Sequence, residues 1–212
     1  MVDLAKFVQQ IPPTTRVYVE DSYLQSTSAD VVSVVVEKNT AYLALNSTIF
    51  HPRAGGQPSD RGTIQGPSFR VEVKRAMLQN GVVVHYGKLD GEPEVGPVKC
   101  NIDWPYRFLM MRRHTAAHLL DYCLATATGL RIETTDSWLG DDPYVGYGGT
   151  APPGLDLAQV QELGNGFIQR GVNVEIMTLD RSTAEKLIAD APNLSRLPKT
   201  ERLRIVTIEG QL

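Results

Sequence analysis

The stretch that decides the fold is His114-Thr115-Ala116-Ala117-His118-Leu119-Leu120, in which two histidines four positions apart run into an apolar sequence. It lies within residues 106–126, which contain no glycine or proline and carry apolar residues at helical spacing, so one long helix is predicted, ended by Gly129. Residues i and i+4 share a face of a helix. Both imidazoles therefore point the same way, which is the arrangement of two ligands of one divalent metal ion, usually zinc.

The histidine pair also has a plainer interpretation. Two of the four histidines can fall at this spacing by chance, and a core histidine can be satisfied by a hydrogen bond. The metalloprotease pattern HExxH is absent, because Ala116 and Ala117 fill the interior and leave no glutamate as general base. The sequence therefore does not indicate a peptidase.

Residues 1–100 are predicted to form a β-rich domain. β-branched or alternating runs occur at 31–36, 40–45, 69–73 and 82–86, with glycine and proline between them. Asn80-Gly81 separates the last two runs and is the strongest short signal for a hairpin. Several short strands with regular turns favour a small barrel or a curled sheet.

Residues 101–212 are predicted to form an α+β domain around the long helix, with an antiparallel sheet. Residues 134–154 are polar and rich in glycine and are expected to be strands and loops. A helix is expected at 156–170 with Asp156 as its N-cap, and strands at 174–178 and 203–208. Ser182 is expected to open a short helix by the capping-box pattern.

Composition narrows the class of protein. The chain has 212 residues, 42% of them hydrophobic, with a net charge of −3 and a pI near 5.8, so nucleic acid would have to bind to a local basic patch. No apolar run approaches the roughly 18 residues that span a bilayer. The amino terminus does not resemble a signal peptide, and two cysteines make no disulfide framework, so a cytoplasmic location is expected.

Two motifs together resemble a known family. Residues 102–120 look like the zinc-helix segment of the alanyl-tRNA editing family, which comprises the AlaX proteins and the editing domains of alanyl- and threonyl-tRNA synthetases. Upstream, residues 55–62 (GGQPSDRG) resemble the GGGQPxDxG motif of that family at the expected distance. Further matches at 18–24, 172–173 and 197–198 extend the resemblance over nearly the whole chain in the right order.

The resemblance implies a hydrolase that removes a wrong amino acid, serine or glycine, from tRNA-Ala. His114 and His118 would be two ligands of a zinc ion that activates the ester or a water molecule. Thr135, with Thr134 as the alternative, would contact the serine hydroxyl, and the bland alternative is that both are ordinary strand residues. Gln57 is the second candidate for a catalytic role.

The remaining candidates would bind substrate. Gly55 and Gly56 allow positive φ and a close approach of backbone to substrate, or they form a plain tight turn. Arg112 and Arg113, with Arg107 beside them, are candidates to contact phosphate, and a solvated helix face is the alternative for some of these arginines.

Three positions of the glycine-rich segment depart from the family pattern. His51, Arg53 and Ala54 stand where relatives have tyrosine, glutamate and a third glycine. Arg53 reverses a charge beside the expected site, which would change the substrate. His51 would serve as a ligand or base, or else as an exposed loop histidine.

The zinc ligands are incomplete at the carboxyl end of the sequence. The family continues past a strand like residues 204–210 into CGGTH, whose cysteine and histidine complete the site, whereas this sequence reaches Leu212 before that segment. Cys123 lies about 140° round the helix from His118 and is poorly placed to substitute. Either the chain is a fragment of a zinc enzyme, or it is a metal-poor descendant that acts on a small molecule or serves as a binding module.

Overall fold

The computed structural model describes residues 2–189, 197 and 200–208. The chain divides into two compact units, the first formed by Met1–Arg112 with Trp138–Asp142 and the second by Arg113–Ser137 with Pro143–Leu212. The sequence-based boundary at residue 100 stays a prediction.

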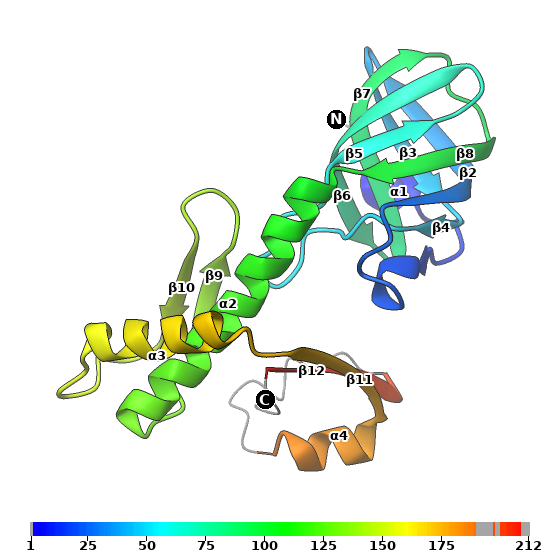
Figure 1. Ribbon diagram of the computed structural model, residues 1–212. Coiled ribbons are helices and arrows are strands. Elements are labelled where there is room, and N and C mark those ends of the chain that lie inside the picture. The colour runs from blue at the N-terminus through cyan, green and yellow to red at the C-terminus, as the bar shows by residue number, and fades with distance from the viewer. Residues whose placement is uncertain (1, 190–196, 198–199, 209–212) are drawn as a thin grey trace. The chain divides into compact units, whose positions relative to one another are not determined.

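The first unit contains a closed barrel, which confirms the expectation of a small barrel (Figure 1). Its strands follow one another in the order β2-β3-β7-β6-β5-β8, and each pairs antiparallel with its neighbours. Their bounds are β2 (Ser26–Glu37), β3 (Thr40–Leu45), β5 (Gly62–Gln65), β6 (Phe69–Gln79), β7 (Val82–Gly91) and β8 (Gly96–Ile102). Outside the barrel lie α1 (Leu4–Phe7), the 3-10 helix η1 (Val17–Val19) and a short parallel pair of β1 (Thr15–Arg16) with β4 (Ser47–Thr48).

The turn between β6 and β7 is the one that the sequence predicted. Asn80 and Gly81 have φ values of 50° and 83°, as a type I′ hairpin turn requires. The strands it joins are longer than expected. The strands β5 and β8 were not predicted, because β5 has only four residues and β8 begins with glycine and proline.

The barrel core contains one buried histidine among apolar side chains. His85 of β7 has no exposed surface, and its Nδ1 lies 3.2 Å from the carbonyl oxygen of Leu43. Because a carbonyl only accepts, Nδ1 carries the proton, and Nε2 then accepts from the Thr48 hydroxyl at 2.8 Å. Both ring nitrogens are satisfied inside the barrel, so His85 is a structural residue.

The long helix is α2 (Trp104–Thr128), which confirms the prediction made from its spacing and lack of glycine. It ends where expected, since Gly129 has φ 69° and its N–H donates to the carbonyl of Ala125. Residues 113–128 of α2 belong to the second unit.

Among its described residues, the second unit contains six further helices and strands, which form two separate apolar clusters. They are β9 (Thr134–Trp138), β10 (Tyr144–Tyr147), α3 (Leu157–Arg170), β11 (Val174–Asp180), α4 (Arg181–Leu187) and β12 (Arg202–Ile208). Apolar side chains of α2 and α3 form one cluster around Leu119, Cys123 and Val160, and α4 covers the β11–β12 pair through Ala184. Asp156 caps α3 as predicted.

Two expectations for this unit were wrong in detail. Within the residues described, β9–β10 and β11–β12 are two separate two-stranded sheets, not one antiparallel sheet. The N-cap of α4 is Asp180, whose carboxylate accepts from the backbone N–H of Thr183, and Ser182 lies inside the helix. The cap therefore lies two residues earlier than expected, and the amide that it satisfies is that of Thr183.

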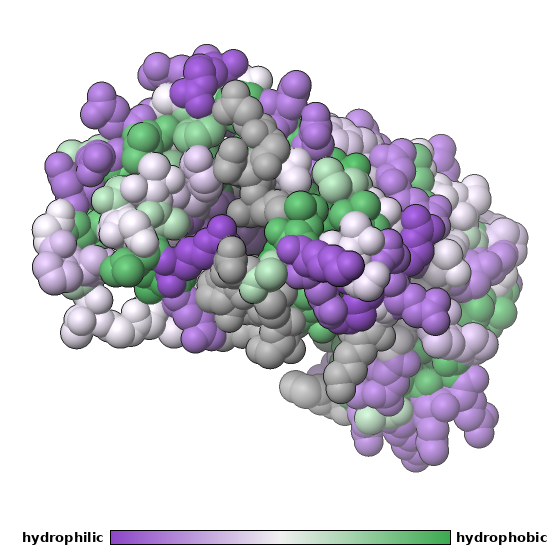
Figure 2. Space-filling view, turned by 90° about the horizontal axis from the view of Figure 1, so that it is seen from below, coloured by the Kyte–Doolittle hydropathy of each residue, from purple (hydrophilic) through white to green (hydrophobic). Residues whose placement is uncertain are grey.

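None of the helices in the described part of the chain is long and apolar enough to cross a membrane. Hydrophilic and hydrophobic residues are interspersed on the face drawn in Figure 2.

Candidate functional site

The glycine-rich segment of the first unit forms a tight turn. Gly55 and Gly56 have φ values of 55° and 75°, and the flanking residues Ala54 and Gln57 exchange backbone hydrogen bonds at 3.1 and 2.9 Å. Two successive positive φ values make a type I′ turn, which a residue with a Cβ adopts at a cost. The positive φ expected of this pair is confirmed, and the loop is a two-residue hairpin tip.

A second stretch of the chain packs on this turn. The N–H of Leu139 donates to the carbonyl of Gly56 at 2.9 Å, and the Arg53 guanidinium lies 5.1 Å from the ring centre of Trp138. Trp138–Asp142 belongs to the first unit for this reason, although it follows α2 in sequence. No local signal in the sequence predicts this packing, because it joins residues more than 80 positions apart.

The base of the loop is clamped by a buried ion pair. Asp60 and Arg107 are 1% and 3% exposed, and Arg107 Nε donates to both carboxylate oxygens of Asp60 at 2.8 and 2.9 Å. The carboxylate also accepts from the N–H of His51 at 2.6 Å. The other guanidinium nitrogens donate to the carbonyls of Ser22 and Ile49. Arg107 is therefore a structural residue, and its proposed contact with phosphate was wrong.

Two candidate residues of the loop are more enclosed than the sequence suggested. Gln57 is 4% exposed. His51 is half-buried, and its ring centre lies 5.2 Å from that of Tyr18 in an edge-to-face arrangement. Its Nδ1 is buried without a hydrogen-bond partner among the described residues. Burial lowers the pKa of His51; the nearby Asp60 carboxylate raises it by less, and the Arg107 guanidinium lowers it slightly further. The alternative of an exposed loop histidine is wrong.

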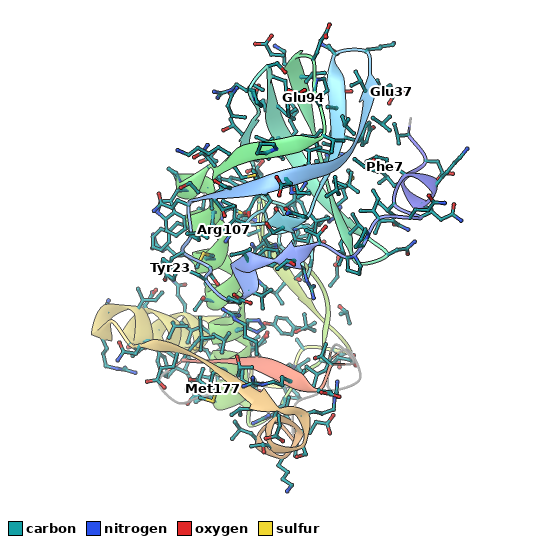
Figure 3. All side chains as sticks on the ribbon, turned by 90° about the vertical axis from the view of Figure 1, so that its right-hand side faces the viewer. Phe7, Tyr23, Glu37, Glu94, Arg107 and Met177 are labelled. Atoms are coloured by element: carbon teal, nitrogen blue, oxygen red, sulfur yellow. The ribbon has the colours of Figure 1, made fainter. Side chains whose placement is uncertain are left out.

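Aromatic side chains form a row at the start of α2, in which Tyr23 and Phe108 are exposed and Trp104 is half-buried. Trp104 lies 5.6 Å from Tyr23 and 5.6 Å from Phe108, measured between ring centres. The exposed Arg112 guanidinium lies 6.0 Å from the ring centre of Phe108. Figure 3 shows Tyr23 at the edge of the molecule. Rings and a guanidinium in such a row are groups on which unpaired bases stack.

The histidine pair lies in the second unit on one face of α2. The rings of His114 and His118 are stacked, with centres 5.1 Å apart and planes 23° apart. The side chain of His118 is 67% exposed. The spacing therefore gives the side-by-side imidazoles that it predicted, and their role as ligands stays a prediction.

The described residues do not complete a zinc site around this pair. In the part of the chain that the structure describes, no three His, Cys, Asp or Glu side chains cluster so as to hold a metal ion. Cys123 is buried in the α2–α3 core, where burial raises the pKa of its thiol. Burial in the barrel raises the pKa of Cys100 to about 12. His114 and His118 would supply two ligands, whereas zinc sites typically have three or four protein ligands.

A carboxylate and a phenol, neither of them predicted from the sequence, lie next to the pair. Asp121 Oδ2 is 3.8 Å from His118 Nδ1, and the Tyr147 hydroxyl donates to Asp121 Oδ1 at 2.6 Å. Burial raises the pKa of Asp121, while the Tyr147 hydrogen bond and the nearby His118 oppose that rise. The position of Asp121 one turn after His118 is a signal that could have identified it.

The two candidate threonines lie on opposite faces of the β9–β10 hairpin. A Cβ added to Gly146 or Gly148 would meet Thr135 at 3.4 and 3.2 Å, so Thr135 covers the glycine side. Tyr147 lies between these glycines and points to the other face, where it reaches Asp121. Thr134, half-buried and adjacent to Thr135, shares that face with Tyr147. Thr134 therefore faces the side of the hairpin that contacts α2, and Thr135 does not.

Comparisons with known proteins agree with this set of features. Residues 13–106 match the family model of the class II (A) tRNA synthetases. The alanyl-tRNA editing protein AlaX-L of Pyrococcus horikoshii is 43% identical over 111 residues, which cover 51% of this chain and 28% of that protein.

Alanine–tRNA ligases match nearly the whole chain. The ligase of Hyperthermus butylicus is 30% identical over 214 residues, covering 97% of this chain and 22% of the ligase. That of Methanopyrus kandleri is 26% identical over 217 residues, covering 95% and 22%. The chain thus spans between 22% and 28% of the length of these curated relatives. With the barrel, the glycine turn and the histidine helix in the order expected, the chain is similar to an alanyl-tRNA editing protein over about half of its length and to alanine–tRNA ligases over nearly all of it.

Proposed function

We propose that this chain edits mischarged tRNA-Ala by hydrolysing the ester that joins serine or glycine to the RNA. The observation that carries the proposal is the stacked pair His114–His118 on a helix face of a chain related to an AlaX editing protein. In the reaction, a water molecule attacks the ester carbonyl and the bond from that carbon to the ribose oxygen breaks.

Zinc is proposed as the cofactor of the protein that contains this chain. The ion would supply Lewis acidity and a water of lowered pKa. The described residues offer it the nitrogens of His114 and His118 only, so no step of the reaction is assigned to it here.

Recognition of the RNA is proposed to involve the exposed arginine of the aromatic row and its neighbour. Arg112 and Arg113 would contact phosphate, and Arg53 with the Gly55–Gly56 turn would approach the acyl end. Gln57 and His51 are enclosed at the base of the loop. They would act there by shaping the loop rather than as freely exposed groups.

Selection of the acyl group is proposed to depend on Thr134. We expect Thr134→Val to lower kcat/KM for the seryl substrate roughly 5- to 30-fold, the equivalent of about 1–2 kcal/mol for a lost hydrogen bond to the serine hydroxyl. The glycyl substrate, which has no hydroxyl, should lose little. Thr135→Val is the matched control, because Thr135 lies on the other face of the hairpin. A larger loss for Thr135→Val than for Thr134→Val would contradict this assignment.

The decisive experiment is a deacylation assay with seryl-tRNA-Ala, using the natural protein that contains this chain. We expect turnover that falls at least about a hundredfold in His114→Ala and His118→Ala, because loss of even an outer-shell partner of a metal ligand costs 10- to 100-fold. Circular dichroism and thermal melts confirm that the variants fold, and elemental analysis gives the zinc content. No turnover with or without added zinc would sink the editing proposal and favour the alternative, a metal-poor protein that binds a small molecule.

A further inference from the structure

Asp121 is placed to act on one nitrogen of one histidine. It follows His118 by three residues on α2, and its Oδ2 lies 3.8 Å from His118 Nδ1. No ion pair of another described carboxylate with His118 is found within 4 Å. The contact is therefore specific for the nitrogen nearest the backbone, and Nε2 is the nitrogen left for other chemistry.

Tyr147 fixes the orientation of that carboxylate. Its hydroxyl donates to Asp121 Oδ1 at 2.6 Å, and its ring packs in the apolar cluster that contains Leu119, Cys123 and Leu124. Because the ring is held in this cluster, the Tyr147 hydroxyl stays in one place and donates to the carboxylate from one direction. With Oδ1 occupied by the phenol, Oδ2 is the oxygen that faces His118.

We propose that Asp121, held by Tyr147, is a positioning residue that keeps the proton of neutral His118 on Nδ1 and presents the Nε2 lone pair. The 3.8 Å separation has to shorten to about 2.8 Å for the bond to close, which a small rotation of the exposed imidazole allows. Which ring nitrogen of a histidine carries the proton is set by the hydrogen bond that the other makes. An imidazole oriented in this way by a carboxylate is suited to bind an electrophile through Nε2.

The importance of this His118 tautomer for hydrolysis rests on the proposed function. The tautomer itself can be present whether or not the protein hydrolyses aminoacyl-tRNA. The proposed function fails if seryl-tRNA-Ala is not deacylated. The positioning role fails if the proton of the His118 ring is not on Nδ1 in the protein without substrate or metal. The two outcomes can therefore be distinguished.

The test is long-range 1H–15N correlation of the histidine rings in the full 15N-labelled protein, at about pH 8, where an ordinary imidazole is neutral. His118→Gln identifies the His118 signals. We expect Nδ1 of His118 to be the protonated nitrogen and Nε2 to resonate as an unprotonated one. His85 is an internal reference, because the Leu43 carbonyl holds its proton on Nδ1.

Two variants distinguish the presence of the Asp121 carboxylate as an acceptor from the orientation that Tyr147 gives it. Asp121→Ala removes the acceptor, and we expect the His118 Nε2 signal to move to the range of a protonated nitrogen. Tyr147→Phe leaves the carboxylate but frees its orientation, so a partial shift in the same direction is expected. Unchanged His85 signals show that the barrel is intact, and unchanged backbone signals of Ala184 and Leu203, which lie in a separate apolar cluster, show the same for the second unit. Protonation of Nε2 in the unmodified protein, or no shift in Asp121→Ala, would overturn the proposal.

Discussion

Replacing Arg107 by methionine is expected to lower the free energy of unfolding of the barrel unit by about 3–5 kcal/mol. The substitution keeps much of the apolar stem but leaves the carboxylate of Asp60, which is 1% exposed, without its partner. It also removes the donors to the Ser22 and Ile49 carbonyls. Breaking a buried pair by removing one partner is far more costly than replacing both, because an uncompensated charge stays in the core.

Both tryptophans, Trp104 and Trp138, lie in the first unit, so their fluorescence during urea unfolding reports on the barrel unit. The matched control is Arg112→Met, five residues along the same helix and exposed, for which the change should stay within about 0.5 kcal/mol. The double variant Asp60→Asn with Arg107→Met should recover part of the loss. If Arg107→Met is as stable as Arg112→Met, the pair does not clamp the loop.

The elements that the sequence predicted are those set by local patterns. Asn80-Gly81 specifies its hairpin by the positive φ of two neighbouring residues, and the spacing within residues 106–126 specifies α2. The closed barrel was foreseen only as one of two options, because closure depends on β5 and β8, whose short and partly polar sequences resemble loops. Pairing between Thr63 and Asn101 is a property of the whole chain and leaves no local trace.

In the candidate site, too, the sequence predicted what local spacing determines and not the contacts between residues far apart in the chain. Helical spacing alone placed His114 and His118 side by side, as the stacked rings are. It did not predict the structural role of Arg107, because Asp60, the partner of the guanidinium, is 47 positions away in the sequence. Nor could it decide between Thr134 and Thr135, because the twist and register of a hairpin determine which of two neighbouring side chains faces the helix.

His85 leads to the second large prediction, a loss of stability in acid. Burial lowers the pKa of His85 to about 4, against an ordinary value of 6.5 that applies to the unfolded chain. Between these two values the unfolded state binds a proton that the folded state does not. Stability from the neutral ring is therefore fully present above pH 6.5 and is lost as the pH falls through 6.5 towards 4.

The size of this loss follows from the difference between the pKa of 6.5 in the unfolded chain and about 4 in the folded one. At about 1.4 kcal/mol per unit, the barrel unit should lose about 3 kcal/mol between neutral pH and pH 4 through this one residue. Urea unfolding followed by tryptophan fluorescence at intervals across that range measures it. His85→Gln offers an amide to Thr48 and Leu43 but does not titrate, so its stability should fall less steeply with acid, and the two curves should converge near pH 4. Parallel curves would show that the buried ring of His85 is not what makes the barrel sensitive to acid.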